Sequence, residues 1–110
     1  MYKRQTQRKD EKNKEKTSLF YLYQNHPNPF GERTTIDYAL YSNARVSLKI
    51  FNSCGQKVRT LVNGIQGPGY YSVPWKGESD AGTKAGSGVY FYRLEVNEKL
   101  SKTKKLIILR

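Results

Sequence analysis

Cysteine and histidine are almost absent from this sequence of 110 residues, which contains one of each, Cys54 and His26. A single cysteine rules out an intrachain disulfide, and the two residues together are too few for a Cys/His metal cluster. A Ser–His or Cys–His nucleophile system would have to rely on His26 alone. We therefore expect a protein that is not an enzyme and that uses no metal, no cofactor and no small-molecule substrate.

Long hydrophobic runs are also lacking, since the longest comprises only residues 106–109, whereas a membrane-spanning helix needs about 18 apolar residues. The N-terminus is polar where the apolar region of a signal peptide would lie. Residues 1–5, however, match the translation of GTG TAT AAG AGA CAG, the end of a transposon adaptor used in sequencing libraries. We expect this start to be a sequencing artefact and the chain to be the tail of a longer protein; the alternative is a genuine basic N-terminus.

Positive charge dominates the sequence, with a formal net charge of +11. Residues 1–18 hold seven Lys and Arg and three Asp and Glu without hydrophobic periodicity. We expect them to form a disordered charged linker ahead of one folded domain, residues 19–110. The alternative for the linker is a nucleic-acid-binding arm, which its interspersed acids disfavour. We expect no nucleic-acid partner, because the charge is spread along the chain and the tyrosines fall at core-facing positions.

From residue 19 onward, apolar and polar residues alternate with the period of β-strands. The core-facing positions of four such segments are Ile36, Tyr38 and Leu40; Val46, Leu48 and Ile50; Tyr71, Val73 and Trp75; and Tyr90, Tyr92, Leu94 and Val96. Turn signals follow about every 8–12 residues, and no segment has a helical period. The sequence predicts an all-β antiparallel sandwich of about seven short strands without a disulfide. Its core is expected to centre on Trp75, Tyr38, Phe30, Tyr90 and Tyr92.

The loops offer no convincing chemical site. Residues 52–55 predict a tight turn in which Cys54 is small and half-buried. The glycine-rich segment, residues 77–88, lacks the contiguous Gly-Lys-Ser/Thr of a phosphate loop. Glu78 and Asp80 are too few acids for a calcium site, and Asp80 is interpreted as a local turn cap. The apolar run near the end leaves the register of the last strand open.

Residues 23–30, Tyr-Gln-Asn-His-Pro-Asn-Pro-Phe, form the most informative local stretch, and its residues 25–30 are called the proline turn. Pro27 and Pro29 fix two φ angles and remove two amide donors, which excludes a central strand. We therefore expect a stiff turn that delivers Phe30 to the core.

The proline turn and later segments together resemble the C-terminal sorting domain (type A) of type IX secretion substrates, and the Ig-like domain of flagellar hook-capping proteins is similar. The later segments are residues 35–38, 46–52, 55–58, 69–73, 75–77, 82, 87–94 and 103–110, so the resemblance covers about residues 20–110 in order. Its motif positions are Asn25, Pro27, Asn28, Pro29, Phe30, Trp75, Gly77, Gly88 and Tyr90. Two departures lie beside the motif: His26 stands where the family usually has Tyr, and Gly31-Glu32 replaces an Asn-containing turn.

The resemblance implies an Ig-like or fibronectin-like sandwich at the C-terminus of a larger exported protein. It would serve as an address read by outer-membrane secretion machinery, so its partners would be that machinery and the N-terminal cargo domain of the parent protein. The implied location is secreted or at the cell surface, reached through the periplasm and the outer membrane, with a signal peptide on the missing N-terminal part. Such domains are commonly removed after translocation. The alternative is a structural Ig-like module of a secreted enzyme or a flagellar hook-cap protein, without a sorting role.

Basic residues near the end of the chain are the candidates for recognition by that machinery: Lys102, Lys104, Lys105 and Arg110. The side chain and the carboxylate of Arg110 are expected to be free for a partner. The lysines have an alternative role, because Lys on an edge strand discourages edge-to-edge aggregation. Both interpretations stay open on the sequence.

Overall fold

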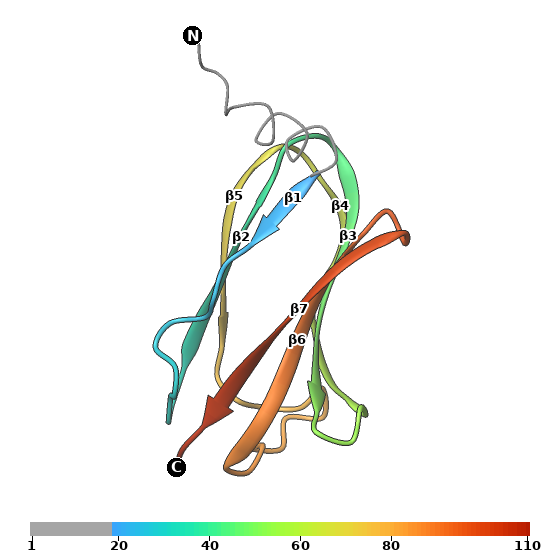
Figure 1. Ribbon diagram of the computed structural model, residues 1–110. Helices are drawn as coiled ribbons and strands as arrows, with labels where there is room; N and C mark the ends of the chain where they lie inside the picture. The colour runs from blue at the N-terminus through green and yellow to red at the C-terminus, as the bar shows by residue number, and fades with distance from the viewer. Residues whose placement is uncertain (1–18) are drawn as a thin grey trace, which may run out of the picture.

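The computed structural model describes residues 19–110, and these residues form seven β-strands and no helix (Figure 1). The strands are β1 (Phe20–Leu22), β2 (Thr34–Leu40), β3 (Ala44–Asn52), β4 (Lys57–Gln66), β5 (Gly69–Trp75), β6 (Gly88–Val96) and β7 (Leu100–Ile108). Within this part of the chain, no helix is long and apolar enough to cross a membrane. The all-β prediction is confirmed, whereas the predictions for residues 1–18 lie outside the described residues.

The strands are arranged in two sheets that face each other across the core (Figure 1). One sheet has the order β1-β2-β5 and the other the order β4-β3-β6-β7, and every pair within them is antiparallel. The predicted antiparallel sandwich of about seven strands is therefore confirmed. β7 forms one edge of the larger sheet, which places the last strand of the chain at the rim of the molecule.

The central strands β3 and β6 follow the predicted alternation. Val46, Leu48 and Ile50 are fully buried, and they pair with Val96, Leu94 and Tyr92 of β6, which are also fully buried. The hairpin between β6 and β7 closes at Asn97 and Glu98, whose φ angles are 56° and 57°. Two successive residues with positive φ form the type of hairpin turn that matches the right-handed twist of the strands.

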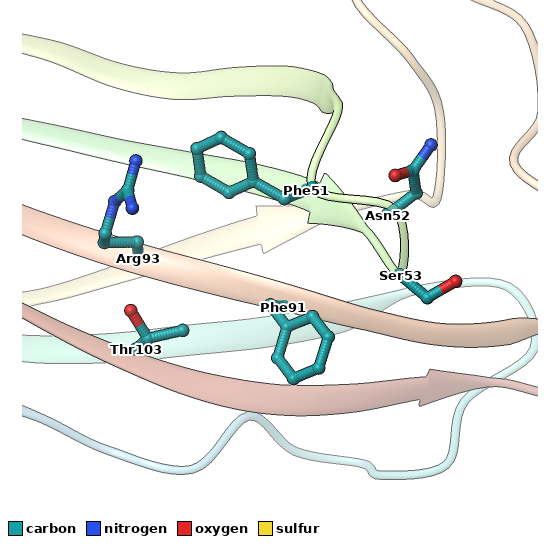
Figure 2. Close-up of a pocket in the computed structure, with 7 residues that line it drawn as sticks. Phe51, Asn52, Ser53, Phe91, Arg93 and Thr103 are labelled. Carbon is teal, nitrogen blue, oxygen red and sulfur yellow. The ribbon is translucent and has the colours of Figure 1, made fainter.

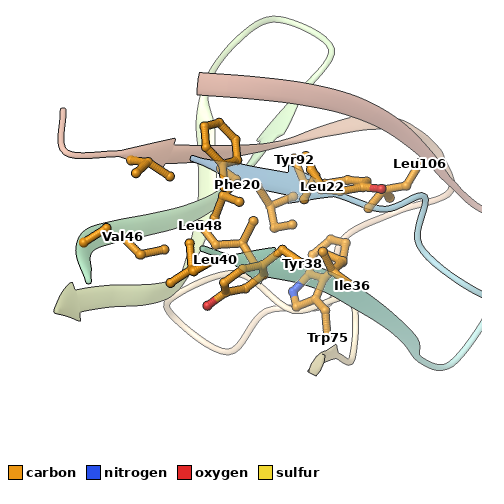
Figure 3. Close-up of a cluster of buried hydrophobic side chains, with 14 of the residues drawn as sticks. Phe20, Leu22, Ile36, Tyr38, Leu40, Val46, Leu48, Trp75, Tyr92 and Leu106 are labelled. Carbon is orange, nitrogen blue, oxygen red and sulfur yellow. The ribbon is translucent and has the colours of Figure 1, made fainter. Parts of the chain in front are cut away.

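Aromatic side chains are packed among the aliphatic side chains of the core, as the sequence predicts (Figure 3). Trp75 is 2% exposed, and its ring centroid lies 5.8 Å from that of Phe30 and 6.2 Å from that of the partly buried Tyr90. Its indole nitrogen donates a 2.9 Å hydrogen bond to the carbonyl of Glu78, so the buried polar atom has a partner. Trp75 thus joins the two sheets without leaving an unpaired donor.

The turn between β3 and β4 corrects one expectation. Oδ1 of Asn52 accepts hydrogen bonds from the backbone nitrogens of Cys54 (2.9 Å) and Gln56 (3.0 Å). These side-chain-to-backbone bonds close the turn locally and hold Cys54 at its exposed tip as a free thiol. The predicted half-buried position of Cys54 is therefore wrong. The thiol is also the one cysteine of the chain, in agreement with the expected lack of a disulfide.

Asp80 is a second correction, because it does not cap its own turn. Its Oδ1 accepts a 3.0 Å hydrogen bond from the backbone nitrogen of Thr60, and its Oδ2 lies 3.6 Å from Nζ of Lys57. Both partners belong to β4, so Asp80 fastens the glycine-rich segment to the edge of the larger sheet. The local cap is supplied instead by Ser79, whose hydroxyl accepts a 3.1 Å bond from the backbone nitrogen of Thr83.

Candidate functional site

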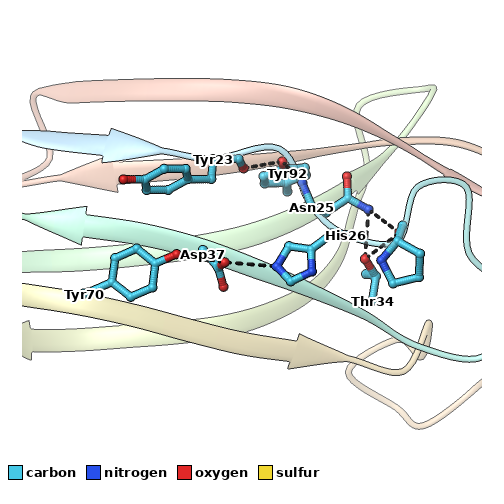
Figure 4. Close-up of polar contacts among 8 residues, drawn as sticks. Tyr23, Asn25, His26, Thr34, Asp37, Tyr70 and Tyr92 are labelled. Atoms are coloured by element: carbon cyan, nitrogen blue, oxygen red, sulfur yellow. Dashed lines mark hydrogen bonds and ion pairs between the residues drawn. The ribbon is translucent and has the colours of Figure 1, made fainter.

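The proline turn is built around the buried side chain of Asn25, which is 3% exposed (Figure 4). Its Nδ2 donates to Oγ1 of Thr34 at 2.9 Å and to the carbonyl of Pro27 at 3.2 Å. The Thr34 hydroxyl in turn donates to the same carbonyl at 2.9 Å. The side-chain amide of Asn25 and the hydroxyl of Thr34 thus supply hydrogen bonds to the carbonyl of Pro27, in a turn whose prolines have no backbone donors. The expected stiff turn is present, and Phe30 at its end is buried.

Tyr92 connects the proline turn to the larger sheet (Figure 4). Its hydroxyl accepts a 2.8 Å bond from the backbone nitrogen of Asn25 and donates a 2.7 Å bond to the carbonyl of Tyr23. Burial raises the pKa of this phenol to about 12, so the hydroxyl stays protonated at every physiological pH. The segment that follows β1 is therefore held against β6 as well as against its own sheet.

The same turn pairs with the C-terminal half of β7, 79 residues away in the sequence. Oδ1 of Asn28 accepts a 2.9 Å bond from the backbone nitrogen of Ile107. The backbone nitrogen of Phe30 donates to the carbonyl of Ile107 at 3.0 Å, and its carbonyl accepts from the nitrogen of Leu109 at 2.8 Å. The end of the proline turn therefore acts as a short extra strand along the outer edge of β7.

Arg110 completes this arrangement by reaching into the surrounding loops. Its guanidinium donates to three carbonyls, those of Ala85 (2.8 Å), Gly31 (2.9 Å) and Gly77 (2.9 Å). Its backbone nitrogen donates a 2.9 Å bond to the hydroxyl of Ser87. The expectation that the Arg110 side chain is free for a partner is therefore wrong, because its donors join Gly31, the residue after the proline turn, to the glycine-rich segment.

Two of the motif glycines differ in the reason for their presence. Gly77 has a φ of +72°, and a Cβ atom there would lie 2.5 Å from Nη2 of Arg110, so both conformation and space require glycine. Gly88 has a φ of +153° at the start of β6, and no atom lies within 4 Å of its hypothetical Cβ. Gly77 is thus required both by its backbone conformation and by the close approach of Arg110, whereas Gly88 is required by its backbone conformation alone.

The three candidate lysines lie on β7, upstream of this anchored end. Lys102 and Lys105 are exposed and Lys104 is half-buried. Lys102 and Lys104 share the inward parity of the buried Leu106, whereas Lys105 lies on the outer face opposite Phe91. The described part of the chain holds no carboxylate within ion-pair distance of these ammonium groups. They are consequently available to an anionic partner.

A separate polar group lies on the outer face of the smaller sheet (Figure 4). Nε2 of His26 and the hydroxyl of Tyr70 each lie 3.0 Å from Oδ2 of Asp37. Burial raises the pKa of the Asp37 carboxyl, but the polar groups of Ser72, His26 and Tyr70 outweigh it, and the net pKa lies below its usual value of 3.8. Asp37 is therefore ionised, and its hydrogen bond is the main reason why the pKa of Tyr70 is raised. This group ties β2 to β5 and to the proline turn.

A shallow pocket of about 260 Å³ lies on the outer face of the larger sheet (Figure 2). Phe51, Phe91, Arg93 and Thr103 line it from three strands, and the turn after β3 forms the rest of its wall. The guanidinium carbon of Arg93 lies 4.6 Å from the centroid of the Phe51 ring, a cation–π contact. Across residues 19–110, no three His, Cys, Asp or Glu side chains come together in a way that suits a metal ion.

Among known protein families, the sequence model described as FlgD Ig-like domain fits residues 28–100 of this chain. The matched part begins inside the proline turn and ends at the first residue of β7. No curated protein sequence matches the chain.

Several solved structures resemble this sandwich, including the following three. Dimeric latent PorU from Porphyromonas gingivalis aligns with 82% of this chain and 9% of its own, at 24% identity and a TM-score of 0.67. PorZ, an essential bacterial surface component of the type-IX secretion system of the same organism, aligns with 81% of this chain and 11% of its own, at 25% identity and a TM-score of 0.53. The alkylpurine DNA glycosylase AlkC of Pseudomonas fluorescens aligns with 84% of this chain and 31% of its own, at 15% identity and a TM-score of 0.53. This chain thus spans about a tenth of PorU and PorZ, and its likeness to PorU and AlkC shows the fold alone.

Proposed function

This chain belongs to the FlgD Ig-like domain family, and from that premise we propose that it is a non-catalytic sorting module of a larger exported protein. The module directs its parent through the outer membrane to the cell surface. Its partners are the outer-membrane secretion machinery and the cargo domain that precedes it.

The likeness to PorZ carries this proposal. PorZ is described as an essential bacterial surface component of the type-IX secretion system, and it is 25% identical to this chain over 81% of the chain's length. The motif positions that resemble type A sorting domains support the same assignment, because several of them meet around β7 and Arg110. A recognition surface that is already ordered binds its partner with higher affinity, because little conformational entropy is lost when the complex forms.

The anchored end of the chain provides the surface that the machinery would read. The backbone of β7 is held by β6 on one side and, near residue 107, by the proline turn on the other. Arg110 is fixed by its contacts with three carbonyls. Lys102 and Lys105 project from this frame into solvent. We assign recognition to these lysines and an anchoring role to Arg110.

The arrangement of the polar groups supports the non-catalytic part of the proposal. The single histidine is engaged with Asp37, and the Asp37 oxygen that it contacts is shared with Tyr70. The pocket on the larger sheet offers a guanidinium and hydroxyls but no acid or base that titrates near neutral pH. These groups serve structure and surface contact.

An export assay tests the proposal. The full chain is fused behind a signal peptide and a reporter in a host with type IX machinery, and the surface fraction of the reporter is measured. Replacing Lys102 and Lys105 together by Glu is expected to retain the reporter in the periplasm. The matched control replaces the exposed Lys76 and Lys84 by Glu, which makes the same change of charge elsewhere on the domain and is expected to leave export unchanged. Equal export of both variants would contradict the assignment of recognition to the lysines.

A second function, a structural Ig-like module of a flagellar hook-cap protein or a secreted enzyme, is favoured by the family match itself. Such a module stays with its parent and contributes only stability or spacing. It predicts that the reporter fusion remains in the periplasm whatever the residues on β7 are.

A further inference from the structure

The outer edge of β7 is occupied along only part of its length. In an antiparallel pair, the backbone groups of alternate residues point toward the partner strand, and those of the residues between them point away. The nitrogen and carbonyl of Ile107 and the nitrogen of Leu109 bond to the proline turn, on the side away from β6. The odd-numbered residues of β7 therefore direct their backbone groups to the outer edge.

Toward the hairpin with β6, this edge is open. The carbonyl of Lys105 accepts a 2.8 Å bond from Nε2 of Gln24, which is the last contact in this direction. Within residues 19–110, the amide of Lys105 and both outward backbone groups of Thr103 and Ser101 have no hydrogen-bond partner. The open stretch is about 13 Å long at 3.3 Å per residue, and Figure 1 shows this hairpin extending away from the smaller sheet.

We propose that this open edge, residues 101–105, is the docking site for an extended segment of a partner protein that carries acidic side chains and adds to the larger sheet as a fifth strand. Unpaired backbone donors and acceptors in a row are complementary to an extended strand and to no other common element. The inference rests on the proposed function for the identity of the partner, which is a component of the secretion machinery.

Charge defines the chemistry of the partner. Lys102 and Lys104 lie on one face of the open edge and Lys105 on the other, and the described residues place no carboxylate beside them. A second copy of β7 would bring like charges into opposition across the new pair, which is destabilising, whereas acidic side chains would gain from the same positions. The lysines that prevent self-association thereby select an acidic strand.

The pocket on the larger sheet favours an apolar residue at one position of the partner strand, the position beside Thr103. The side chain of Thr103 lies on the outer face of the sheet and forms the β7 wall of the pocket that contains Phe51 and Phe91. The residue of an added strand that sits beside Thr103 projects on the same face, at the rim of this pocket (Figure 2). Its neighbours in the added strand project toward Lys102 and Lys104. The partner segment therefore alternates acidic residues with an apolar one.

Hydrogen exchange of the full chain, followed by NMR, tests the inference. The probe is a short synthetic peptide in which glutamate and valine alternate, and the control peptide replaces each glutamate by lysine. At saturation, the acidic peptide is expected to slow exchange of the Ser101, Thr103 and Lys105 amides severalfold. The lysine peptide is expected to leave these rates unchanged. Resonances that shift without slower exchange at these amides would mean that the anion binds the lysines without forming a strand, and would overturn the proposal.

Two variants separate the backbone from the charge. Thr103→Pro removes one outward amide that β6 does not use, so the fold is expected to persist while peptide affinity falls at least severalfold. The double variant Lys102→Glu with Lys104→Glu is expected to bind the lysine peptide more tightly than the acidic peptide. This variant keeps the proposal testable if Thr103→Pro does not fold. Slow exchange that depends on protein concentration without peptide would identify a second copy as the occupant and refute the inference. If the reporter fusion is exported but the acidic peptide does not protect these amides, only the docking inference is refuted. If the peptide protects these amides but the reporter fusion is not exported, only the proposed function is refuted.

Discussion

Gly77 and Arg110 are mutually dependent. Nη2 of Arg110 donates a 2.9 Å hydrogen bond to the carbonyl of Gly77, and a Cβ atom on Gly77 would lie 2.5 Å from that same nitrogen. The position of the Arg110 guanidinium therefore requires that residue 77, which lies 33 positions earlier, has no side chain. Through Arg110, the glycine-rich segment and the proline turn are held at one end of the sandwich.

The first prediction concerns this pair. Gly77→Ala is expected to destabilise the domain by more than Gly82→Ala, because both place alanine at a positive φ, which costs about 1–2 kcal/mol, but only Gly77 crowds Arg110. The difference should be about 1 kcal/mol, the worth of a typical hydrogen bond, in chemical denaturation. In an Arg110→Ala background the difference should vanish. A difference that persists there would show that Arg110 is not the cause.

The second prediction tests the aromatic core. Trp75→Ala removes a ring that is 2% exposed and contacts Phe30 and Tyr90, and it is expected to cost about 3–5 kcal/mol. This loss is a large fraction of a total stability of about 5–15 kcal/mol, so the melting temperature should fall well below that of the wild type. Tyr41→Ala, at a side chain that is 59% exposed, is the control and should melt close to the wild type. A cooperative, near-normal transition for Trp75→Ala would contradict its place in the core.

The third prediction concerns acid stability. The pKa of Asp37 is below its usual value of 3.8 in the folded state, because the polar groups around it outweigh burial. A carboxyl whose pKa is depressed by folding stabilises the protein above its unfolded pKa, and this contribution is lost as the pH falls through the folded pKa. The melting temperature should therefore drop below about pH 4, and Asp37→Asn should flatten that drop. Glu32→Gln should leave the slope unchanged, and equal slopes for Asp37→Asn and the wild type would refute the role of Asp37.

The fourth prediction concerns the end of the chain. A polar extension after Arg110 leaves the guanidinium contacts and the Ser87 bond in place, so the melting temperature should stay near that of the wild type. Export of the reporter fusion should nevertheless fall, because chain added after residue 110 would hinder the approach of the machinery to the surface formed by β7 and its lysines. The same extension placed before residue 1 is the control. Normal export of the C-terminally extended fusion would show that a free terminus is not what the machinery reads.

Much of the strand content of this domain could be predicted from local pattern, because the central strands β3 and β6 bury side chains in alternation. Val46, Leu48 and Ile50 on β3 are the plainest case, and all three are fully buried. The last strand was ambiguous, since residues 106–109 are all apolar. The inward position of Leu106 and Ile108 follows from pairing with Tyr90 and Gly88, which no local pattern contains.

The meeting of the proline turn with the chain end could not be predicted for a different reason. The contacts of Asn28 with Ile107 and of Arg110 with Gly77 run to a backbone amide and a backbone carbonyl, and every residue type except proline carries both groups, so the sequence does not mark these partners. Asp80 was misassigned for the same reason, because its partner is the amide of Thr60 in another strand. Charge alone pointed to Arg110 as a free recognition residue, although a guanidinium with many donors is also well suited to bridging loops.

The surface fraction of the intact reporter fusion, compared between a host with type IX machinery and an otherwise identical strain that lacks it, tests the central claim most directly. Protease treatment of whole cells measures this fraction without disrupting the outer membrane. If the domain is a sorting module, the reporter reaches the surface only where the machinery is present and stays in the periplasm in its absence. A reporter confined to the periplasm in both strains would contradict the sorting function and favour the structural module.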